Sequence, residues 1–526
     1  MTGMQTTPRS TVDAPERKFQ LWPPQISWDP TDAVDKALAV LRTVARNLSP
    51  ASLWRNHRLF TVAICLSIVP RFIASMGFKP ALFIQDSFSY MSQSLHIKLG
   101  QLRPAGYPMM LRILEPFHSL LLVTTVQHIM GLALGAIIYA VLRSRGLPAW
   151  GATLAALPTL FDSRQIWLES SILPDTLFTL VLMIAVAILI VRPRPGIWDA
   201  VVVGVLVAYA SVIRGNGAPV FVVIIAFMLI RRVGWRVIVA CVAAFAIPLV
   251  AYMTWFYSVF GQFNITNSSG LFLWSRTMSF ANCSIIKPPK NLLPLCPENQ
   301  PDYVAGPAPA WSTDWVVNQR TPADYLWDPG VWYQHDAHPG INAYNNKLGM
   351  EFAERAILAQ PFDYLKTVGE GVMLTFLSTD RPTDYLSDQF TVAPHIPSLA
   401  HWMRYYEKKY AQTTQNTHPH NPWAYLMFWY QMPVWFPGWL FLAVFLAGLG
   451  FLVKRWRGWG VYAALAWGVG ITNLVVPIAA HELDYRYALS AVPFACLALG
   501  LALNKKPAPG QVEPPAPAPA LGQLRD

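Results

Sequence analysis

Ten runs of apolar residues limit what this chain can fold into. They lie near residues 59–76, 120–142, 147–163, 172–191, 197–213, 217–231, 237–257, 433–453, 459–479 and 487–503. Most reach the roughly 17 to 25 residues that an α-helix needs to cross the hydrocarbon core of a bilayer. The third run, bounded by Pro148 and Asp162, has the least defined ends. The pattern predicts an all-α polytopic membrane protein with about ten transmembrane helices.

The composition agrees with this prediction, because 54% of the residues are hydrophobic and only 13% are charged. A net charge of +11 would by itself suit an anionic partner such as a nucleic acid. The lysines and arginines, however, lie between the apolar runs and form no single patch or arm. Nucleic acid is therefore excluded as a partner, and membrane lipid is expected around the chain.

Basic residues flank alternate ends of the apolar runs, and such residues mark cytoplasmic loops. The clusters on the predicted cytoplasmic side are Arg55 and Arg58; Arg143 and Arg145; Arg192 and Arg194; Arg231, Arg232 and Arg236; Lys454, Arg455 and Arg457; and Lys505 and Lys506. Both termini then lie inside a multi-pass cell (plasma) membrane protein. The first span is expected to stay as an anchor, since no cleavage pattern follows it.

This topology divides the chain into five regions. They are a cytoplasmic segment at 1–57, a transmembrane module at 58–257 whose first external loop is 77–119, an extracytoplasmic loop domain of mixed or irregular structure at 258–432, C-terminal transmembrane helices at 433–503 and a disordered cytoplasmic tail at 504–526. Residues 32–47 have helical amphipathic spacing, which fits either a helix on the membrane surface or a solvated helix without a membrane role.

The loop domain contains one segment, 361–377, that resembles a further span. Lys366 and Glu370 lie within it, and an eleventh crossing would move the Lys454 cluster outside, so we expect a surface-lying helix. The domain is also rich in aromatic residues. Their flat rings suit sugar binding, although aromatic belts at membrane level explain many such residues; among them are Trp311, Trp315, Trp327 and Trp332.

The cysteines fit the same topology. Cys65, Cys241 and Cys496 lie in apolar runs, where a thiol behaves as a small apolar group. Cys283 and Cys296 both lie in the external loop, and a disulfide between them is expected in an oxidising compartment. No Cys or His spacing indicates a structural metal site.

The first external loop is the first place where acidic, aromatic and basic side chains gather. Asp86 lies in the stretch 83–90, just after the first apolar run, and a second stretch at 99–108 follows it. An ionisable group near hydrocarbon is a functional candidate, because desolvation makes it costly without a partner. The alternative is that Asp86 only caps a helix.

Two acidic residues lie in the short external turn between the third and fourth runs. Glu169 could contact an acceptor or a divalent ion, or cap a helix. Asp175 follows Pro174, and we favour a capping role for it.

Three arginines, Arg103, Arg214 and Arg486, are predicted on the outer face, against the usual distribution of positive charge. Arg214 lies in a glycine-containing turn, and Arg486 lies in the polar stretch 481–487 between the last two runs. The guanidinium of Arg486 suits phosphate. A salt bridge from Arg486 to Glu482 at helical spacing, or snorkelling to the interface, is the structural alternative.

These stretches resemble the GT-C fold glycosyltransferases, polytopic enzymes that use lipid-phosphate sugars and include protein O-mannosyltransferases, the lipid A aminoarabinose transferase and actinobacterial envelope transferases. The resembling residues are Asp86 to Tyr90, Gly106 to Pro108, Glu169 to Phe178, Arg214, and Arg486 with Tyr487. One departure is that Ser87 follows Asp86, where protein O-mannosyltransferases have a paired Asp-Glu.

The resemblance implies Asp86 as the catalytic carboxylate and Arg486 as a contact to donor phosphate. It implies further substrate-binding positions at Tyr90, Arg103, Tyr107, Glu169, Arg214 and Tyr487. The implied reaction is inverting transfer of a sugar from a polyprenyl-phosphate donor to a hydroxyl of a glycan, lipid or protein on the outer face. The resemblance names no certain cofactor, and a requirement for a divalent cation is left open.

Two other classes of protein remain open. A transporter or flippase for a lipid-linked or anionic solute would need ionisable groups near the bilayer midplane or broken helices in matching halves. The charged residues here are predicted at the outer ends of the spans. An inactive scaffold would keep the fold without the activity.

Overall fold

The computed structural model describes residues 50–96, 99–192, 194–300, 320–377, 385, 409–410, 419–454 and 456–504. The amphipathic stretch at 32–47 and the tail after 504 lie outside these residues. The chain divides into two compact units, 1–58 and 59–526. Only the first residues of helix α2 (Pro50–Gly77) are described in the first unit, and all other described elements belong to the second.

The described residues are helical, and an isolated bridge between Leu82 and Ser171 is the one strand-like pairing among them. Five stretches are long and apolar enough to cross a membrane: His57–Gly77 in α2, α5 (Leu120–Ser144), α11 (Trp235–Phe260), Gly458–Ala480 with α20 (Val461–Ala480), and α21 (Tyr485–Leu503). Five shorter apolar helices are α6 (Ala149–Phe161), α8 (Asp175–Val191), α9 (Ile197–Ile213), α10 (Gly217–Ile230) and α19 (Gly438–Lys454). These helices agree with the expected all-α fold of a membrane-embedded protein.

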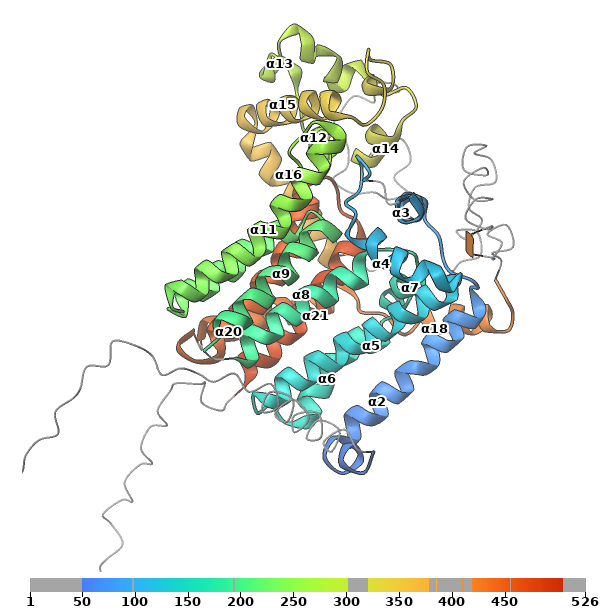
Figure 1. Cartoon of the computed structure of the whole chain (residues 1–526), viewed down its shortest axis with the longest axis vertical. Helices are drawn as coiled ribbons and strands as arrows, with labels where there is room; N and C mark the ends of the chain where they lie inside the picture. The colour runs from blue at the N-terminus through green and yellow to red at the C-terminus, as the bar shows by residue number, and fades with distance from the viewer. Residues whose placement is uncertain are drawn as a thin grey trace, which may run out of the picture. The chain divides into compact units, whose positions relative to one another are not determined.

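The apolar helices pack into a bundle, in which α21 contacts α5, α6, α8, α19 and α20. Figure 1 shows α5, α6, α8, α9, α20 and α21 running side by side. Small residues allow close approach, as in many membrane bundles. A Cβ at Gly204 of α9, for example, would lie 2.5 Å from the carbonyl oxygen of Cys241 in α11.

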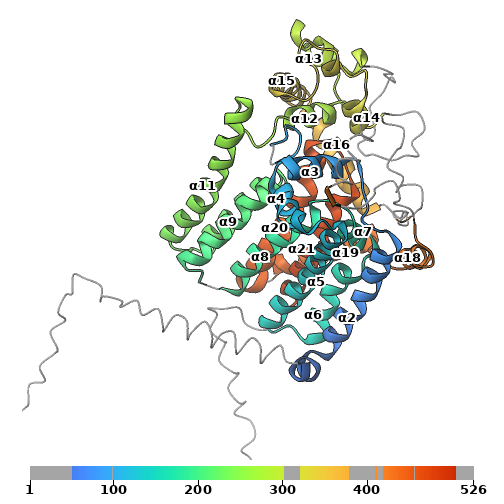
Figure 2. The ribbon, with the colours of Figure 1, turned by 45° about the vertical axis from the view of Figure 1, so that its right-hand side comes forward.

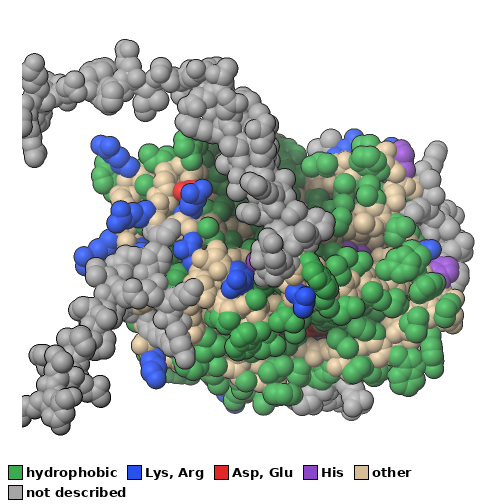
Figure 3. All heavy atoms as spheres, turned by 90° about the horizontal axis from the view of Figure 1, so that it is seen from below, with side chains coloured by type: hydrophobic (Ala, Val, Ile, Leu, Met, Phe, Trp, Pro, Cys, Tyr) green, Lys and Arg blue, Asp and Glu red, His purple; other side chains and the backbone are tan. Residues whose placement is uncertain are grey.

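One end of the bundle collects the basic clusters. Arg145, after α5, donates to the carbonyl of Val191 at the end of α8, and Asn504 after α21 donates to the carbonyl of Arg145. The guanidinium of Arg145 also stacks on Trp459, before α20. Lys and Arg are the prevailing charged side chains on the face seen in Figure 3. The ends of α5, α8 and α21, which the sequence predicts on one side, therefore lie together at one end of the bundle.

The opposite end carries the short helices of the loops that the sequence predicts to be external, which keep the name external loops below. The first loop forms α3 (Gln85–His96), α4 (Gly106–Leu114) and the turn η1 (Glu115–Phe117), and α7 (Ser163–Ser170) joins α6 to α8. Leu82 donates its backbone N–H to Ser170, and Ile172 donates to Leu82. These two bonds hold the start of α3 beside the start of α8. Helix α18 (Trp423–Gln431) packs against α7.

Residues 262–300 and 320–360, called the cap here, have a small core of their own. The cap contains α12 (Ser269–Thr277), α13 (Cys283–Ile286), α14 (Pro322–Trp327), α15 (Ala343–Ala359) and the turns η2 (Lys290–Leu295), η3 (Pro297–Asn299) and η4 (Trp332–Gln334). Its buried centre is formed by Leu271, Trp274, Tyr333 and Phe352 with their neighbours. The described part of the expected irregular domain is therefore largely helical.

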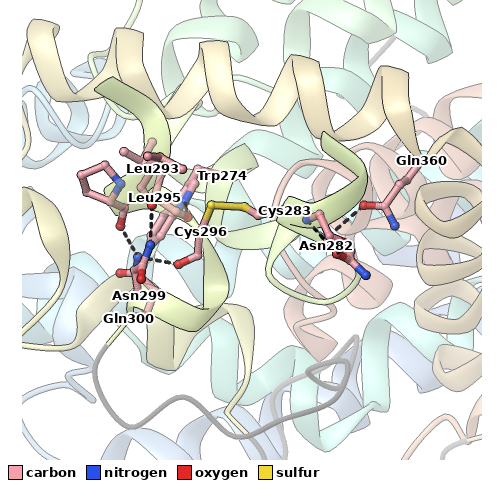
Figure 4. Close-up of a disulfide and its surroundings, with 11 residues drawn as sticks. Trp274, Asn282, Cys283, Leu293, Leu295, Cys296, Asn299, Gln300 and Gln360 are labelled. Atoms are coloured by element: carbon pink, nitrogen blue, oxygen red, sulfur yellow. Dashed lines mark hydrogen bonds between the residues drawn. A yellow bond between two sulfur atoms is a disulfide. The ribbon is translucent and has the colours of Figure 1, made fainter. Parts of the chain in front are cut away.

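The expected disulfide between Cys283 and Cys296 is present (Figure 4). Trp274 lies beside it and donates from Nε1 to the carbonyl of Leu295 at 2.9 Å. Gln360 accepts a hydrogen bond from the backbone of Asn282 on the other side. The disulfide therefore links α13 covalently to the η2–η3 turns within the cap.

Helix α16 (Pro361–Leu377) is the segment expected to lie on a surface. Val368, Val372 and Phe376 pack against the α19–α20 part of the bundle, whereas Phe362 on another face is 83% exposed. It is not among the helices whose length and hydropathy suit a membrane span. The rejection of an eleventh span at this segment agrees with that result.

Candidate active site

A cavity of about 990 Å³ lies where the cap meets the end of the bundle that carries the external loops. Figure 2 shows α3 and α4 between the bundle and the cap helices α12 and α14. The cavity is lined by the first external loop, the starts of α8 and α21, the α9–α10 turn and the cap. Its charged or titratable side chains include Asp86, Arg103, Asp175, Arg214, His481, Glu482, Asp484 and Arg486.

Three helices begin at the cavity wall, and each brings a carboxylate there. Asp86 is in the first turn of α3, Asp175 is the first residue of α8, and Asp484 is the N-cap of α21. Carboxylates are stabilised at such helix starts by the exposed N–H groups and the helix dipole. Asp484 makes the capping bond itself, accepting from the backbone N–H of Arg486 at 3.0 Å.

Each carboxylate also pairs with an arginine. Asp86 lies between two of them, since Arg103 Nη2 is 2.5 Å from its Oδ1 and Arg486 Nη1 is 3.3 Å from its Oδ2. Arg486 also donates from Nε to Asp484 at 2.6 Å, and Arg214 pairs with Asp175. The cavity thus presents three arginines and three aspartates that compensate one another.

The arginines decide the protonation of Asp86. Burial raises its pKa, but Arg103 and Arg486 together outweigh burial and hold the pKa below its usual range. Asp484 behaves in the same way beside Arg486, and its pKa is also lowered. Asp86 is therefore ionised at neutral pH, and its basicity would rise if a competing anion drew the arginines away.

Aromatic side chains also line the site or pack directly behind its lining. Tyr487 lies under the guanidinium of Arg214, which is 5.0 Å from the ring centroid. Tyr90 lines the cavity, and burial raises its pKa to about 12, so its hydroxyl stays protonated. Tyr107 packs edge to face against Tyr90, with ring centroids 5.3 Å apart. The hydroxyl of Tyr107 donates a hydrogen bond to Gln127 at 2.6 Å.

Most of the residues predicted from the sequence meet in this cavity. Those that line it are Asp86, Tyr90, Arg103, Arg214, Arg486 and Tyr487. Tyr107 is fully buried behind Tyr90 and is not part of the lining. The expected aromatic residues Trp311 and Trp315 lie outside the described residues, Trp327 lines the cavity, and Trp332 packs in the cap.

Glu169 is away from the cavity, in a buried ionic cluster of the bundle. Its carboxylate accepts from Arg71 Nε at 2.8 Å and lies 2.9 Å from Nδ1 of His128. Gln165 donates to the other carboxylate oxygen at 3.1 Å. This cluster joins α2, α5 and α7, and it gives Glu169 a structural role in place of the expected contact to acceptor or metal.

Two alternatives weighed from the sequence need correction. Asp175 is the first residue of α8, as expected of a helix-start residue, but no side-chain capping bond is made there and its carboxylate pairs with Arg214. Arg486 does not pair with Glu482 at helical spacing, because α21 begins only at Tyr485 and Arg486 contacts Asp484 and Asp86. Asp86 likewise stands at a helix start but uses both carboxylate oxygens on arginines.

Asp484 and Phe272 are lining residues that the sequence did not single out. A signal for Asp484 existed, because an Asp two residues before an arginine at the start of an apolar run can cap the helix and pair with the arginine at once. Phe272 gave no such signal, since nothing in its neighbourhood distinguishes it from a core residue.

Known proteins add nothing to these observations. Comparison with protein-family models, curated proteins and solved structures finds no match. The interpretation therefore rests on the chemistry of the site.

Two findings bear on a divalent ion. Among the described residues, the group of side chains close enough to hold a metal is Cys283, Cys296 and Glu298, whose two sulfur atoms are bonded to each other. In the cavity, Asp86, Asp175 and Asp484 each contact an arginine. A divalent cation there would have to displace a guanidinium, just as an anion would have to displace a carboxylate.

Proposed function

We propose that this chain is a membrane glycosyltransferase of the GT-C type, with about ten membrane spans and a site that faces the extracytoplasmic side. It would transfer a sugar from a polyprenyl-phosphate donor to an acceptor hydroxyl. The observation that supports this most is the position of Asp86, an ionised carboxylate between Arg103 and Arg486 in a large cavity at one end of an apolar bundle.

The arginines suit a phosphate for two reasons. A guanidinium offers a planar fork of donors that matches phosphate oxygens, and it stays charged at any physiological pH. Each cavity arginine is now held by a carboxylate, so a phosphate would enter by exchange. When it takes hydrogen bonds from Arg486 and Arg103, their hold on Asp86 weakens and the pKa of this carboxyl rises towards its normal range.

The proposed step is a single displacement at the anomeric carbon. The acceptor hydroxyl oxygen forms the new bond to that carbon, and its proton passes to Asp86. The bond from the anomeric carbon to the phosphate oxygen breaks, and the phosphate keeps the electron pair. Arg486 and Arg103 stabilise the charge that develops on the departing polyprenyl phosphate. One base is enough, because phosphate leaves without protonation, unlike the alcohol in glycoside hydrolysis.

The decisive test follows the fate of the donor in reconstituted vesicles. Purified protein is inserted into vesicles that contain a radiolabelled polyprenyl-phosphate sugar, with an extract of envelope glycans as acceptor. Glycosyl transfer releases free polyprenyl phosphate and moves the label to the acceptor. A flippase would move the intact donor between leaflets and release no polyprenyl phosphate, and that result would overturn the proposal. Mass spectrometry of envelope glycans from cells that lack the protein should then identify the missing sugar.

A further inference from the structure

The part of the cavity wall that the cap forms carries two large aromatic rings. Phe272 of α12 and Trp327 of α14 line it, and Trp327 is 44% exposed. The two rings meet edge to face, with centroids 6.4 Å apart and planes at 79°. A large indole left open to a cavity is costly in water, and such exposed rings commonly mark a binding surface.

The position of Trp327 is fixed by contacts on both sides of its short helix. Thr321 and Asp324 form a capping box at the start of α14. The backbone N–H of Ala323 donates to Glu482 at 3.1 Å, which ties α14 to the loop between α20 and α21. Phe272 is fixed in turn by His481, whose ring meets it edge to face with centroids 4.8 Å apart. The two rings are therefore held in place before any ligand arrives, which lowers the entropic cost of binding.

Polar groups line the same cavity as the rings. Asn264 and Ser269 are among the lining residues, Ser269 one helical turn before Phe272 in α12, and within the described residues their side chains make no hydrogen bond. Ser268 is already committed to the carbonyl of Leu102 at 3.0 Å. An amide and a hydroxyl in one cavity with two aromatic rings can satisfy hydroxyl groups of a ligand whose apolar face covers the rings.

This wall reaches the proposed base through direct contacts. The guanidinium of Arg103 lies 5.6 Å from the ring centroid of Phe272, and the same guanidinium is 2.5 Å from Asp86. The side chains of Phe272 and Arg103 thus connect Trp327 to the carboxylate of Asp86. A ligand on the rings can present a hydroxyl group to Asp86 while a phosphate occupies the arginines.

We propose that Trp327 and Phe272 form the acceptor platform of this enzyme and that the acceptor is a carbohydrate. This inference rests on the proposed glycosyl transfer. A sugar ring has an apolar C–H face for an aromatic ring and hydroxyl groups around its edge for Asn264 and Ser269. A phosphorylated lipid headgroup would instead need cations, and each arginine of the cavity, including Arg103 beside Phe272, is already paired with a carboxylate.

The test separates acceptor binding from donor binding. Full-length protein in nanodiscs is applied to an array of defined oligosaccharides of pentoses and hexoses, and binding of undecaprenyl phosphate is measured in parallel. Trp327→Ala should weaken oligosaccharide binding by roughly 10- to 100-fold, the loss typical of an anchoring aromatic residue. Trp327→Phe should retain most of it, and neither change should alter undecaprenyl-phosphate binding. Tyr344→Ala is the matched control, because Tyr344 is a 49% exposed aromatic residue of the cap outside the cavity lining.

Each failure has a separate meaning. If undecaprenyl phosphate binds but no oligosaccharide does, or if Trp327→Ala binds oligosaccharides as the wild type does, the platform is overturned and the proposed transfer stands. If undecaprenyl phosphate does not bind, the proposed donor class itself is wrong. Equal losses in Trp327→Ala and Tyr344→Ala would also overturn the platform, because they would indicate general damage to the cap.

Discussion

Nη1 of Arg486 lies 3.3 Å from Oδ2 of Asp86, although 400 positions separate the two residues in the chain. The contact joins the first turn of α21 to the first turn of α3. Because Arg486 also holds Asp484, the last apolar helix and the first external loop meet at one guanidinium. Substitutions of Asp86 and of Arg486 should therefore distinguish the loss of a general base from the loss of a phosphate-binding group.

Asp86→Asn should lower the transfer rate by about 10²- to 10⁴-fold, the usual contribution of a general base. The amide keeps the size of the side chain but cannot take a proton from the acceptor. Donor binding should be retained, since the arginines that would contact phosphate are still present. Single-turnover transfer and polyprenyl-phosphate affinity, measured on the same preparation, check both parts.

Asp484→Asn is the matched control for Asp86→Asn, because Asp484 also pairs with Arg486 and lines the cavity. We expect a much smaller loss of rate from it. Equal losses would mean that both acids act only by holding Arg486, and the assignment of Asp86 as the base would fail.

Arg486→Ala should raise the dissociation constant of polyprenyl phosphate by about 10- to 100-fold, because a hydrogen bond to a charged group contributes roughly 1.5–3 kcal/mol. Arg486→Lys should restore only part of this affinity, since an ammonium group lacks the two-pronged geometry. Titration of nanodisc protein with polyprenyl phosphate measures both. An unchanged affinity in Arg486→Ala would show that the phosphate binds elsewhere.

The apolar runs allowed the helices of the bundle to be predicted because each must satisfy its own backbone in hydrocarbon. The position of Glu169 could not be predicted in that way. Its partner Arg71 lies 98 residues earlier, and only packing brings them together. Arg71 nevertheless gave a signal, since a charged residue inside an apolar run requires a buried partner. The pairing of Asp175 with Arg214 depends in the same way on how α8 and α9 pack.

The topology makes a prediction that needs no activity. Single cysteines placed near residues 145, 194 and 234 should be protected from a membrane-impermeant maleimide in intact cells, whereas cysteines near 86 and 484 should react. The reason is that Arg145 shares one end of the bundle with the ends of α8 and α21, and the cavity lies at the other. Labelling at 145 but not at 484 in intact cells would invert the protein and refute an outward-facing site.

Gly131→Ala should destabilise the bundle. A Cβ at this position in α5 would lie 1.7 Å from Oε1 of Glu169 and would force the carboxylate away from Arg71. Disrupting a buried ion pair costs about 3–5 kcal/mol. Thermal unfolding in detergent should show a clearly lower midpoint. Gly450→Ala in the apolar helix α19 is the control, because no atom lies within 4 Å of the added Cβ. Similar midpoints for the two variants would argue against the cluster as a structural element.

Glu482 gives the loop between α20 and α21 a pH dependence. Burial is the main cause that raises the pKa of its carboxyl from about 4.5 to about 8, with the Ala323 N–H opposing the rise and Asp484 adding to it. Between these values the folded protein keeps a proton that the unfolded chain releases. Stability contributed by this group is therefore complete below about pH 4.5, falls as the pH rises and is lost by about pH 8.

Glu482→Gln removes this titration while it keeps an oxygen that can accept from Ala323. The variant should match the wild type near pH 5 and unfold at a higher temperature at pH 8, since the wild type must then bury a charge or strain its contacts. His481 also titrates differently in the two states, because its pKa is lowered from 6.5 to about 3 by burial and by nearby arginines. Both proteins carry His481, so its contribution cancels when their midpoints are compared at the same pH. Thermal unfolding midpoints of both proteins from pH 5 to 9 provide the measurement. Parallel curves across that range would show that Glu482 is already ionised in the folded protein.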